Sequence, residues 1–188
     1  MKLVYSIPDK LYYIENFLNY SSYKKLHYDV FKSNLVSLES TKNKWHKDLK
    51  YGYTNFVDST KLDVNYPPLQ KIKILLENNL FHKLKIKNYI PLIHSMKNGS
   101  GINWHDDSGH LYGITYYINR RWNPMFGGEF LFTDKKSNGF IPLMGNSLVI
   151  VKAPLQHKVT PVTGSIIPRK TIQIFIHKEK EKNETKNS

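Results

Sequence analysis

The second half of the chain is a succession of short segments with strand character, separated by turn-forming residues. In one of them apolar and polar residues alternate at Ile172, Ile174 and Ile176, as in a strand with one buried face. Another, Ser147–Val151, is an apolar run typical of a buried strand. Many short strands with glycine, proline and asparagine between them predict a β-sandwich or barrel. The strands are expected at 102–107, 111–119, 128–133, 139–142, 147–151, 155–162 and 169–177.

The beginning of the chain carries one strand pattern and one helical pattern. A strand is expected at 10–14, between turn signals. The pair Ser21–Ser22 offers an N-cap for a helix in which Tyr23, Leu26 and Val30 recur at helical spacing. We expect this helix to cover one face of a sheet.

A second helix is expected after Pro67–Pro68, where Leu69, Ile72, Leu76 and Leu80 form one apolar stripe. Its expected role is to support the strands that follow. Both helices therefore belong to an N-terminal region that flanks the β-rich part of the chain, and the fold class is mainly β with flanking α-helices (α+β).

A length of 188 residues fits one domain with a core of its own. The prediction is a single domain over 1–177, in which 1–89 supply supporting helices and strands and 90–177 form the β-rich core. The charged segment 178–188 has no apolar position and is expected to be a disordered tail.

The chain contains no cysteine. Neither a disulfide nor a thiolate metal site can form, so any metal ligands must be histidines and carboxylates. The N-terminus has no apolar run long enough for a signal peptide, and no stretch approaches the ~18 apolar residues that span a membrane. These features predict a cytoplasmic protein without a membrane partner.

The formal net charge of +13 is compatible with a nucleic-acid partner. However, the arginines are only Arg120, Arg121 and Arg169, and the lysines are spread along the chain rather than clustered. Arginine is the preferred bidentate reader of phosphates and bases. The sequence therefore disfavours nucleic acid as the partner. We attribute the positive charge to solubility and general electrostatic steering.

Trp104–Asp107 brings an imidazole and a carboxylate two residues apart. In a strand, His105 and Asp107 point to the same face while Asp106 points to the other, so the pair can take two neighbouring positions on one metal ion. A further histidine, His157, follows the apolar strand at 147–151. Two histidines and one carboxylate that leave open positions are the ligand set of non-haem Fe(II) oxygenases.

Arg169 opens the last strand, where Arg169, Thr171, Gln173 and Phe175 share one face. A guanidinium one strand beyond the second histidine can hold a dicarboxylate co-substrate through a bidentate, charge-assisted contact. We therefore expect Arg169 to anchor such a co-substrate.

Residues from about 90 to 177 resemble the catalytic domain of the 2-oxoglutarate/Fe(II)-dependent dioxygenases, and among these the prolyl hydroxylase branch. The matching blocks are His105–Asp107, Thr115–Asn119, Trp122 with Gly127–Phe130, Gly145–Val149, His157–Val159 and Arg169–Thr171. The resemblance implies a double-stranded β-helix (jelly-roll, cupin-like) core. It also implies Fe(II), 2-oxoglutarate, O2 and supporting ascorbate, and hydroxylation of a C–H bond, with a prolyl residue of a protein or peptide as substrate.

The same resemblance implies residue roles. His105, Asp107 and His157 would hold the iron, and Arg169, Tyr117 and Thr171 would bind 2-oxoglutarate. Tyr116 would replace Tyr117 if the register shifted by one residue.

The resemblance also implies that His110, Trp122 and Phe175 lie on the substrate side of the site, although aromatic residues more often fill cores than bind substrate. Gly127–Gly128 is expected to permit a tight turn or a close backbone approach beside the cleft. His94 is interpreted as a wall or surface histidine, and Ser95 stands about where related prolyl hydroxylases carry a tyrosine.

Two alternatives remain open. One is oxidative demethylation of nucleic acid by the same chemistry, but such relatives carry a second arginine where this chain has Phe175, which cannot supply the charge-assisted contacts of arginine. The other is a jelly-roll binding or structural protein without catalysis. The complete set of His105, Asp107, His157 and Arg169 argues against it.

Overall fold

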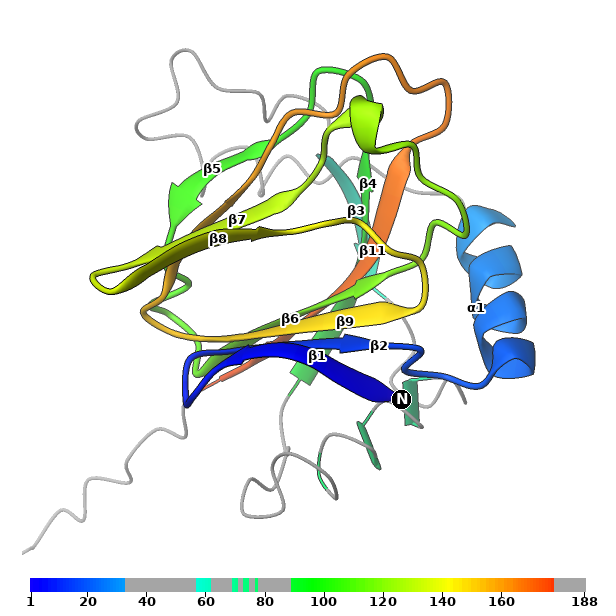
Figure 1. Ribbon diagram of the computed structural model, residues 1–188. Helices are drawn as coiled ribbons and strands as arrows, with labels where there is room; N and C mark the ends of the chain where they lie inside the picture. Colours follow the sequence, from blue (N-terminus) through cyan, green and yellow to red (C-terminus); the bar gives the residue numbers. More distant parts are fainter. Residues whose placement is uncertain (33–56, 62–68, 71–72, 75–76, 78–88, 178–188) are drawn as a thin grey trace, which may run out of the picture.

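The computed structural model describes residues 1–32, 57–61, 69–70, 73–74, 77 and 89–177. Within this part of the chain the strands form two antiparallel sheets (Figure 1). The larger sheet has the order β1-β2-β9-β6-β11-β4-β3, and the smaller has the order β5-β10-β7-β8. Two facing antiparallel sheets are the predicted jelly-roll architecture.

The strand bounds agree with the sequence expectations to within a few residues. The large sheet contains β1 (Lys2–Ile7), β2 (Leu11–Glu15), β3 (Val57–Lys61), β4 (Tyr89–Met96), β6 (Tyr112–Tyr117), β9 (Ser147–Lys152) and β11 (Arg169–Ile176). The small sheet contains β5 (Ile102–His105), β7 (Phe130–Asp134), β8 (Ser137–Ile141) and β10 (Gln156–Val159). A short 3-10 helix, η1, spans Pro124–Phe126. The edge strand β1 was not predicted.

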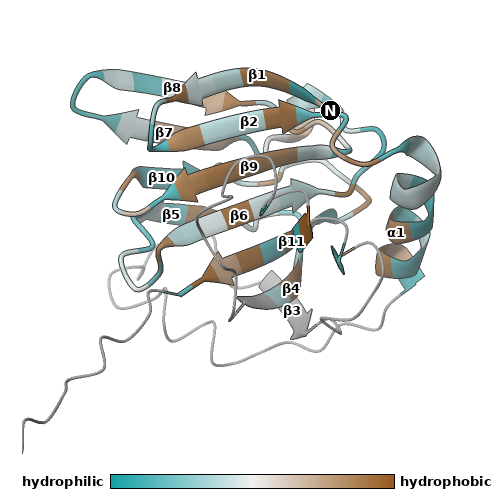
Figure 2. Ribbon diagram, turned by 90° about the horizontal axis from the view of Figure 1, so that it is seen from below, coloured by the Kyte–Doolittle hydropathy of each residue, from teal (hydrophilic) through white to brown (hydrophobic). Residues whose placement is uncertain are grey.

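Buried apolar residues lie on both faces of the large sheet. Its inner strand β9 is hydrophobic along most of its length (Figure 2). One face packs against the small sheet through a cluster that joins Val149 and Val151 of β9 to Phe130 and Phe132 of β7. A strand buried on both faces needs a continuous apolar run, which explains the sequence of β9.

The opposite face of the large sheet packs against helix α1 (Tyr20–Lys32), which lies beside it in Figure 1. Tyr23, Leu26 and Val30 are the buried residues of the helix, as the periodicity predicted. The predicted N-cap was wrong. The side chain of Asn19, one residue before the helix, accepts the backbone N–H of Ser22 at 2.9 Å.

The end of α1 is held by a buried lysine of β11. Lys170 Nζ donates to the carbonyl oxygen of Val30 at 3.0 Å. Carbonyls in the last turn of a helix lack partners within the helix, so this ammonium supplies a bond and complements the helix dipole. The helix is thereby tied to the strand that also carries Arg169.

Parts of the predicted N-terminal region lie outside the described residues. In the second predicted helix, the described positions 69–70, 73–74 and 77 are helical, and Leu69 is buried in the core cluster that contains α1. The predicted tail at 178–188 lies outside the described residues. Among those residues, no helix combines the length and apolar character needed to cross a membrane.

Candidate active site

A cavity between the two sheets collects most of the polar side chains that the sequence singled out. Its walls come from β4, β6 and β11 of the large sheet and from β5, β7 and β10 of the small sheet, with Asp107 two residues beyond the end of β5. His105, His157, Arg169, Thr171 and Phe175 all line it.

His105 and His157 are brought together by strand pairing. They are direct partners on the antiparallel strands β5 and β10, and their ring centres lie 4.1 Å apart. The ring of His157 also stacks on Phe130 of the neighbouring strand β7, with ring centres 5.1 Å apart. Both imidazoles are therefore fixed by the small sheet.

Asp107 reaches His105 and His157 from a turn and not from a strand. The prediction of a strand over 102–107 was wrong at its end, because β5 stops at His105. Asp107 adopts a positive φ of 52°, a conformation that aspartate tolerates better than most residues. Asp106 holds this turn by accepting the backbone N–H of Ser108 at 3.0 Å.

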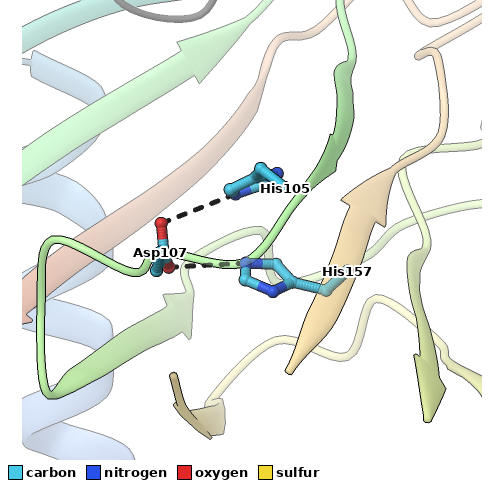
Figure 3. Close-up of side chains that lie close together, drawn as sticks. All are labelled: His105, Asp107 and His157. Carbon is cyan, nitrogen blue, oxygen red and sulfur yellow. Dashed lines mark ion pairs between the residues drawn. The ribbon is translucent and has the colours of Figure 1, made fainter. Parts of the chain in front are cut away.

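The carboxylate of Asp107 points at both imidazoles (Figure 3). Its Oδ1 lies 3.7 Å from His105 Nε2, and its Oδ2 lies 3.4 Å from His157 Nε2. One ligand atom from each of the three residues lies within 4.8 Å of the others. This spacing suits a single ion bound by all three side chains.

The hydrogen bonds of both imidazoles leave their Nε2 atoms for a metal. His105 Nδ1 lies 2.7 Å from the carbonyl oxygen of Asn103, and His157 Nδ1 lies 2.8 Å from that of Leu155. A carbonyl oxygen only accepts, so each Nδ1 must carry the proton and donate it. Such a bond to Nδ1 orients the ring of a metal-binding histidine and leaves the lone pair on Nε2.

The electrostatics of the group favour a charged Asp107 and a neutral His105. Burial alone would raise the pKa of Asp107, but the hydrogen bond and charge of His157, together with the charge of His105, outweigh it and lower the pKa. Burial, followed by the charge of His157, lowers the pKa of His105. Metal ligands must be deprotonated, so these shifts suit metal binding.

Arg169 lies in the same cavity and is only 1% exposed. Its Nε donates to the carbonyl oxygen of Gly128 at 3.0 Å, and its Nη1 contacts the sulfur of Met96 at 3.5 Å. A side chain at position 128 would collide with Arg169, since a β-carbon there would lie 2.9 Å from Cδ. The predicted close backbone approach at Gly127–Gly128 is thus confirmed at Gly128, where φ is 81°.

Arg169 and Tyr117 form a buried pair of donors. The guanidinium carbon lies 5.2 Å from the centre of the Tyr117 ring. Arg169 Nη2 and the Tyr117 hydroxyl are both buried and have no hydrogen-bond partner among the described residues. Buried donors are nearly always paired, and a buried charge without a partner is costly. A ligand carboxylate would satisfy both groups.

The register of the central strands separates Tyr117 from Tyr116. Tyr117 faces the cavity side, whereas Tyr116 belongs to the cluster that packs with α1, and its hydroxyl bonds to Asn146 Oδ1 at 2.7 Å. Thr171 pairs with Tyr117 across β6 and β11 and is buried in the cavity wall. The structure therefore places Tyr117, rather than Tyr116, beside Arg169.

The residues predicted for substrate have different locations. Phe175 lines the cavity, and His110 stacks on it with ring centres 4.4 Å apart. Trp122 lies elsewhere and packs on Phe126, and its indole N–H donates to the carbonyl oxygen of Gly127 at 2.8 Å. It is absent from the cavity wall.

Three further cavity residues had no predicted role in binding. His94 was interpreted as a wall or surface histidine, and in the structure it is buried in the cavity wall. Gln173 and Thr115 also line the cavity and are joined by a 2.7 Å hydrogen bond from the Thr115 hydroxyl to Gln173 Oε1. The alternation along β11 was sufficient to place Gln173 on the face of Arg169 and Thr171.

Two imidazoles and one carboxylate that share a jelly-roll cavity with a buried arginine match the ligand set of non-haem Fe(II) oxygenases. Comparison with known families agrees. Residues 91–177 match the family described as the 2OG-Fe(II) oxygenase superfamily. This match indicates a 2-oxoglutarate-dependent dioxygenase, an oxidoreductase, and the matched family implies Fe(II), 2-oxoglutarate and O2.

Solved structures with the same fold include prolyl hydroxylases. A prolyl-4-hydroxylase from Pseudomonas putida is 13% identical and superposes with a TM-score of 0.68, covering 90% of this chain and 93% of its own. A prolyl hydroxylase from Trichoplax adhaerens, in complex with a peptide fragment of the hypoxia inducible factor oxygen degradation domain, is 16% identical. Its TM-score is 0.66, with 90% of this chain and 84% of its own covered.

The likeness extends to other chemistry. The non-haem alpha-ketoglutarate-dependent epimerase SnoN from nogalamycin biosynthesis is 10% identical, with a TM-score of 0.62 over 90% of this chain and 78% of its own. At these identities the likeness concerns the fold. Comparison with curated protein sequences found no significant match.

Proposed function

We propose that this oxygenase hydroxylates a C–H bond of a prolyl residue in a protein or peptide, with release of succinate and CO2. The observation that carries the proposal is a cavity that holds His105, Asp107 and His157 at one place and Arg169 at another, with Tyr117 packed beside Arg169. A metal site and a carboxylate site in one cavity suit a co-substrate that binds both.

In this proposal His105, Asp107 and His157 hold Fe(II) through two Nε2 atoms and a carboxylate oxygen. A ligand set of three protein groups leaves the remaining positions open for co-substrate and oxygen. The bound iron supplies the oxidising chemistry, with O2 as oxidant and 2-oxoglutarate as the co-reductant that is decarboxylated.

The remaining roles belong to the chain itself. Arg169 and the Tyr117 hydroxyl bind the distal carboxylate of 2-oxoglutarate, and Thr171 lies beside them on β11. Charge-assisted bonds to a buried guanidinium are stronger than neutral ones and impose an orientation on the carboxylate. Burial of this end also keeps water away from the anchored co-substrate.

A prolyl substrate is supported by the shared fold with two prolyl hydroxylases, one of which is in complex with a peptide. On the substrate side we assign Phe175 in the cavity wall and His110 stacked on it, and we keep Trp122, predicted from the sequence, as a candidate at greater distance. We also propose ascorbate as supporting reductant, a cytoplasmic location and a single domain over 1–177.

The direct test measures succinate formed by purified protein with Fe(II), 2-oxoglutarate and ascorbate. His157→Ala removes one proposed ligand and should abolish succinate formation. His27→Gln is the matched control, because His27 lies on α1 and stacks on Phe31 rather than facing the cavity. Its succinate formation should equal that of the wild type.

The substrate class follows from the same assay. Proline-containing peptides should increase succinate formation and gain one oxygen atom in mass, whereas methylated oligonucleotides should do neither. If oligonucleotides alone stimulate turnover, the demethylase alternative replaces the prolyl one. If the protein binds neither metal nor 2-oxoglutarate in a titration, it is a jelly-roll binding protein and the proposed activity is wrong.

A further inference from the structure

Gly113 occupies an unusual place for a glycine, in the interior of a central strand. It is buried in β6 and pairs with Val151 of β9 on one side and with Phe175 of β11 on the other. Glycine inside a strand costs conformational entropy and has no side chain to pack. Such a glycine often marks a point where another group approaches the backbone closely.

The group that approaches Gly113 is the carboxylate of Asp107. A β-carbon at position 113 would lie 2.5 Å from Asp107 Oδ2 and 3.9 Å from Gln173 Nε2. Cβ atoms do not come this close to an oxygen, so any side chain at position 113 would displace the carboxylate.

On the cavity face of β6, each residue has a different role. By strand alternation, residues 113, 115 and 117 share this face. Tyr117 lies beside Arg169, Thr115 is bonded to Gln173, and at Gly113 the space of a side chain is filled by Asp107. The strand thus borders both the candidate co-substrate site and the candidate metal site.

Asp107 needs such a support because β5 does not hold it. β5 ends two residues earlier, and Asp107 lies in a turn with positive φ, where its carbonyl oxygen accepts the N–H of His110 at 2.8 Å. Its side chain is nonetheless only 10% exposed and aims both oxygens at imidazoles (Figure 3). The strand β6 closes the remaining side of the carboxylate.

We propose that Gly113 is a positioning residue for Asp107: its missing side chain leaves the space in which the carboxylate is seated against β6 in its metal-binding orientation. The proposal rests on the proposed function, in which Asp107 is a metal ligand. Gly113 lies outside the histidine and arginine blocks that resemble the family, and in this proposal it has a specific effect on the affinity for metal.

The test is Gly113→Ala, with metal affinity as the readout. Co(II) or Mn(II) should bind on the order of 10–100-fold more weakly than to the wild type, the usual cost of removing an outer support of a metal ligand. The visible absorption of bound Co(II), which reports the ligand set, should change as well. Gly109→Ala is the matched control, since a β-carbon there would meet nothing within 4 Å.

A double variant separates steric displacement of Asp107 from general damage. In an Asp107→Ala background the obstacle is gone, so adding Gly113→Ala should weaken metal binding no further, and the two effects should be strongly non-additive. If Gly113→Ala alone fails to fold, the double variant decides. It folds if the carboxylate is the obstacle, and it stays unfolded if Gly113 serves another purpose, which would overturn the proposal.

The remaining outcomes distinguish the inference from the proposed function. If Gly113→Ala binds metal like the wild type while Asp107→Ala binds weakly, the role of Gly113 is refuted and the metal site stands. If Asp107→Ala itself binds metal like the wild type, Asp107 is no ligand. Both the metal assignment and the role of Gly113 are then wrong.

Discussion

His105 and His157 lie directly opposite each other on the antiparallel strands β5 and β10, with ring centres 4.1 Å apart. Side chains alternate between the faces of a strand, so a slip of one residue in this pairing would turn one imidazole away from the cavity. The candidate metal site therefore depends on the register of the small sheet as much as on the residues themselves.

Arg169→Lys should weaken 2-oxoglutarate binding by roughly 10–100-fold, because a lysine keeps the charge but cannot present a bidentate fork to a carboxylate. Affinity for Mn(II) alone should be unchanged, since Arg169 is not among the candidate ligands. Calorimetric titration measures both constants. Arg120→Lys is the control, because Arg120 donates to the hydroxyl of the exposed Tyr20, the first residue of α1. Equal losses in the two variants would argue against a co-substrate role for Arg169.

Tyr117→Phe should have opposite effects on stability and on binding. Removal of a buried hydroxyl that lacks a partner leaves the free energy of unfolding unchanged or raises it, while 2-oxoglutarate loses a donor and binds several-fold more weakly. Tyr116→Phe is the matched control. It breaks the bond to Asn146 and should lower the free energy of unfolding by about 1 kcal/mol, with 2-oxoglutarate affinity unchanged.

Urea unfolding gives the free energy of unfolding of each tyrosine variant, and titration gives its affinity for 2-oxoglutarate. The reverse pattern, with Tyr116 needed for 2-oxoglutarate and Tyr117 for stability, would mean that the alternative register is the functional one.

His94 should make the metal-free protein less stable as the pH falls. Burial, with a smaller contribution from Arg169 and opposed by Asp107, lowers the pKa of His94 from 6.5 to about 4. Between these values the unfolded chain takes up a proton that the folded protein does not bind. The free energy of unfolding therefore decreases from neutral pH down to about pH 4 and levels off below it for this group.

The size of this effect between pH 7 and pH 5 is about 2 kcal/mol, given 1.36 kcal/mol per pKa unit. Urea unfolding at the two pH values measures it, and His94→Gln should reduce the pH dependence by about this amount. A variant with the same pH dependence as the wild type would show that His94 is protonated equally in both states.

Lys170→Met should destabilise the fold by about 1–3 kcal/mol, because the carbonyl oxygen of Val30 loses its bond from a buried ammonium. Helix α1 should then fray at its end, which amide hydrogen exchange detects. Lys25→Met removes an exposed ion pair with Asp29 on the same helix and should cost at most about 0.5 kcal/mol. Equal losses in the two variants would refute the capping role.

Local sequence patterns predicted most of the strands and the buried face of α1. Alternation and apolar runs depend only on neighbours along the chain, so β6, β7, β9 and β11 are found within a few residues of their expected bounds. The cap of α1 was missed because Ser21–Ser22 matched the pattern that Asn19 fulfils in the structure. The edge strand β1 carries a weaker pattern, and the sequence did not predict it.

The sequence by itself limited the possible metal ligands to histidines and carboxylates, because the chain has no cysteine, and it predicted His105, Asp107 and His157 as ligands and Arg169 as a carboxylate anchor. Only the tertiary structure decided how these groups meet. Pairing of β5 with β10 opposes the histidines, a turn rather than a strand delivers Asp107, and the register of β6 and β11 puts Tyr117 beside Arg169. The space at Gly113 for the Asp107 carboxylate likewise exists only in the fold, because contacts between distant segments depend on sheet register and not on local sequence.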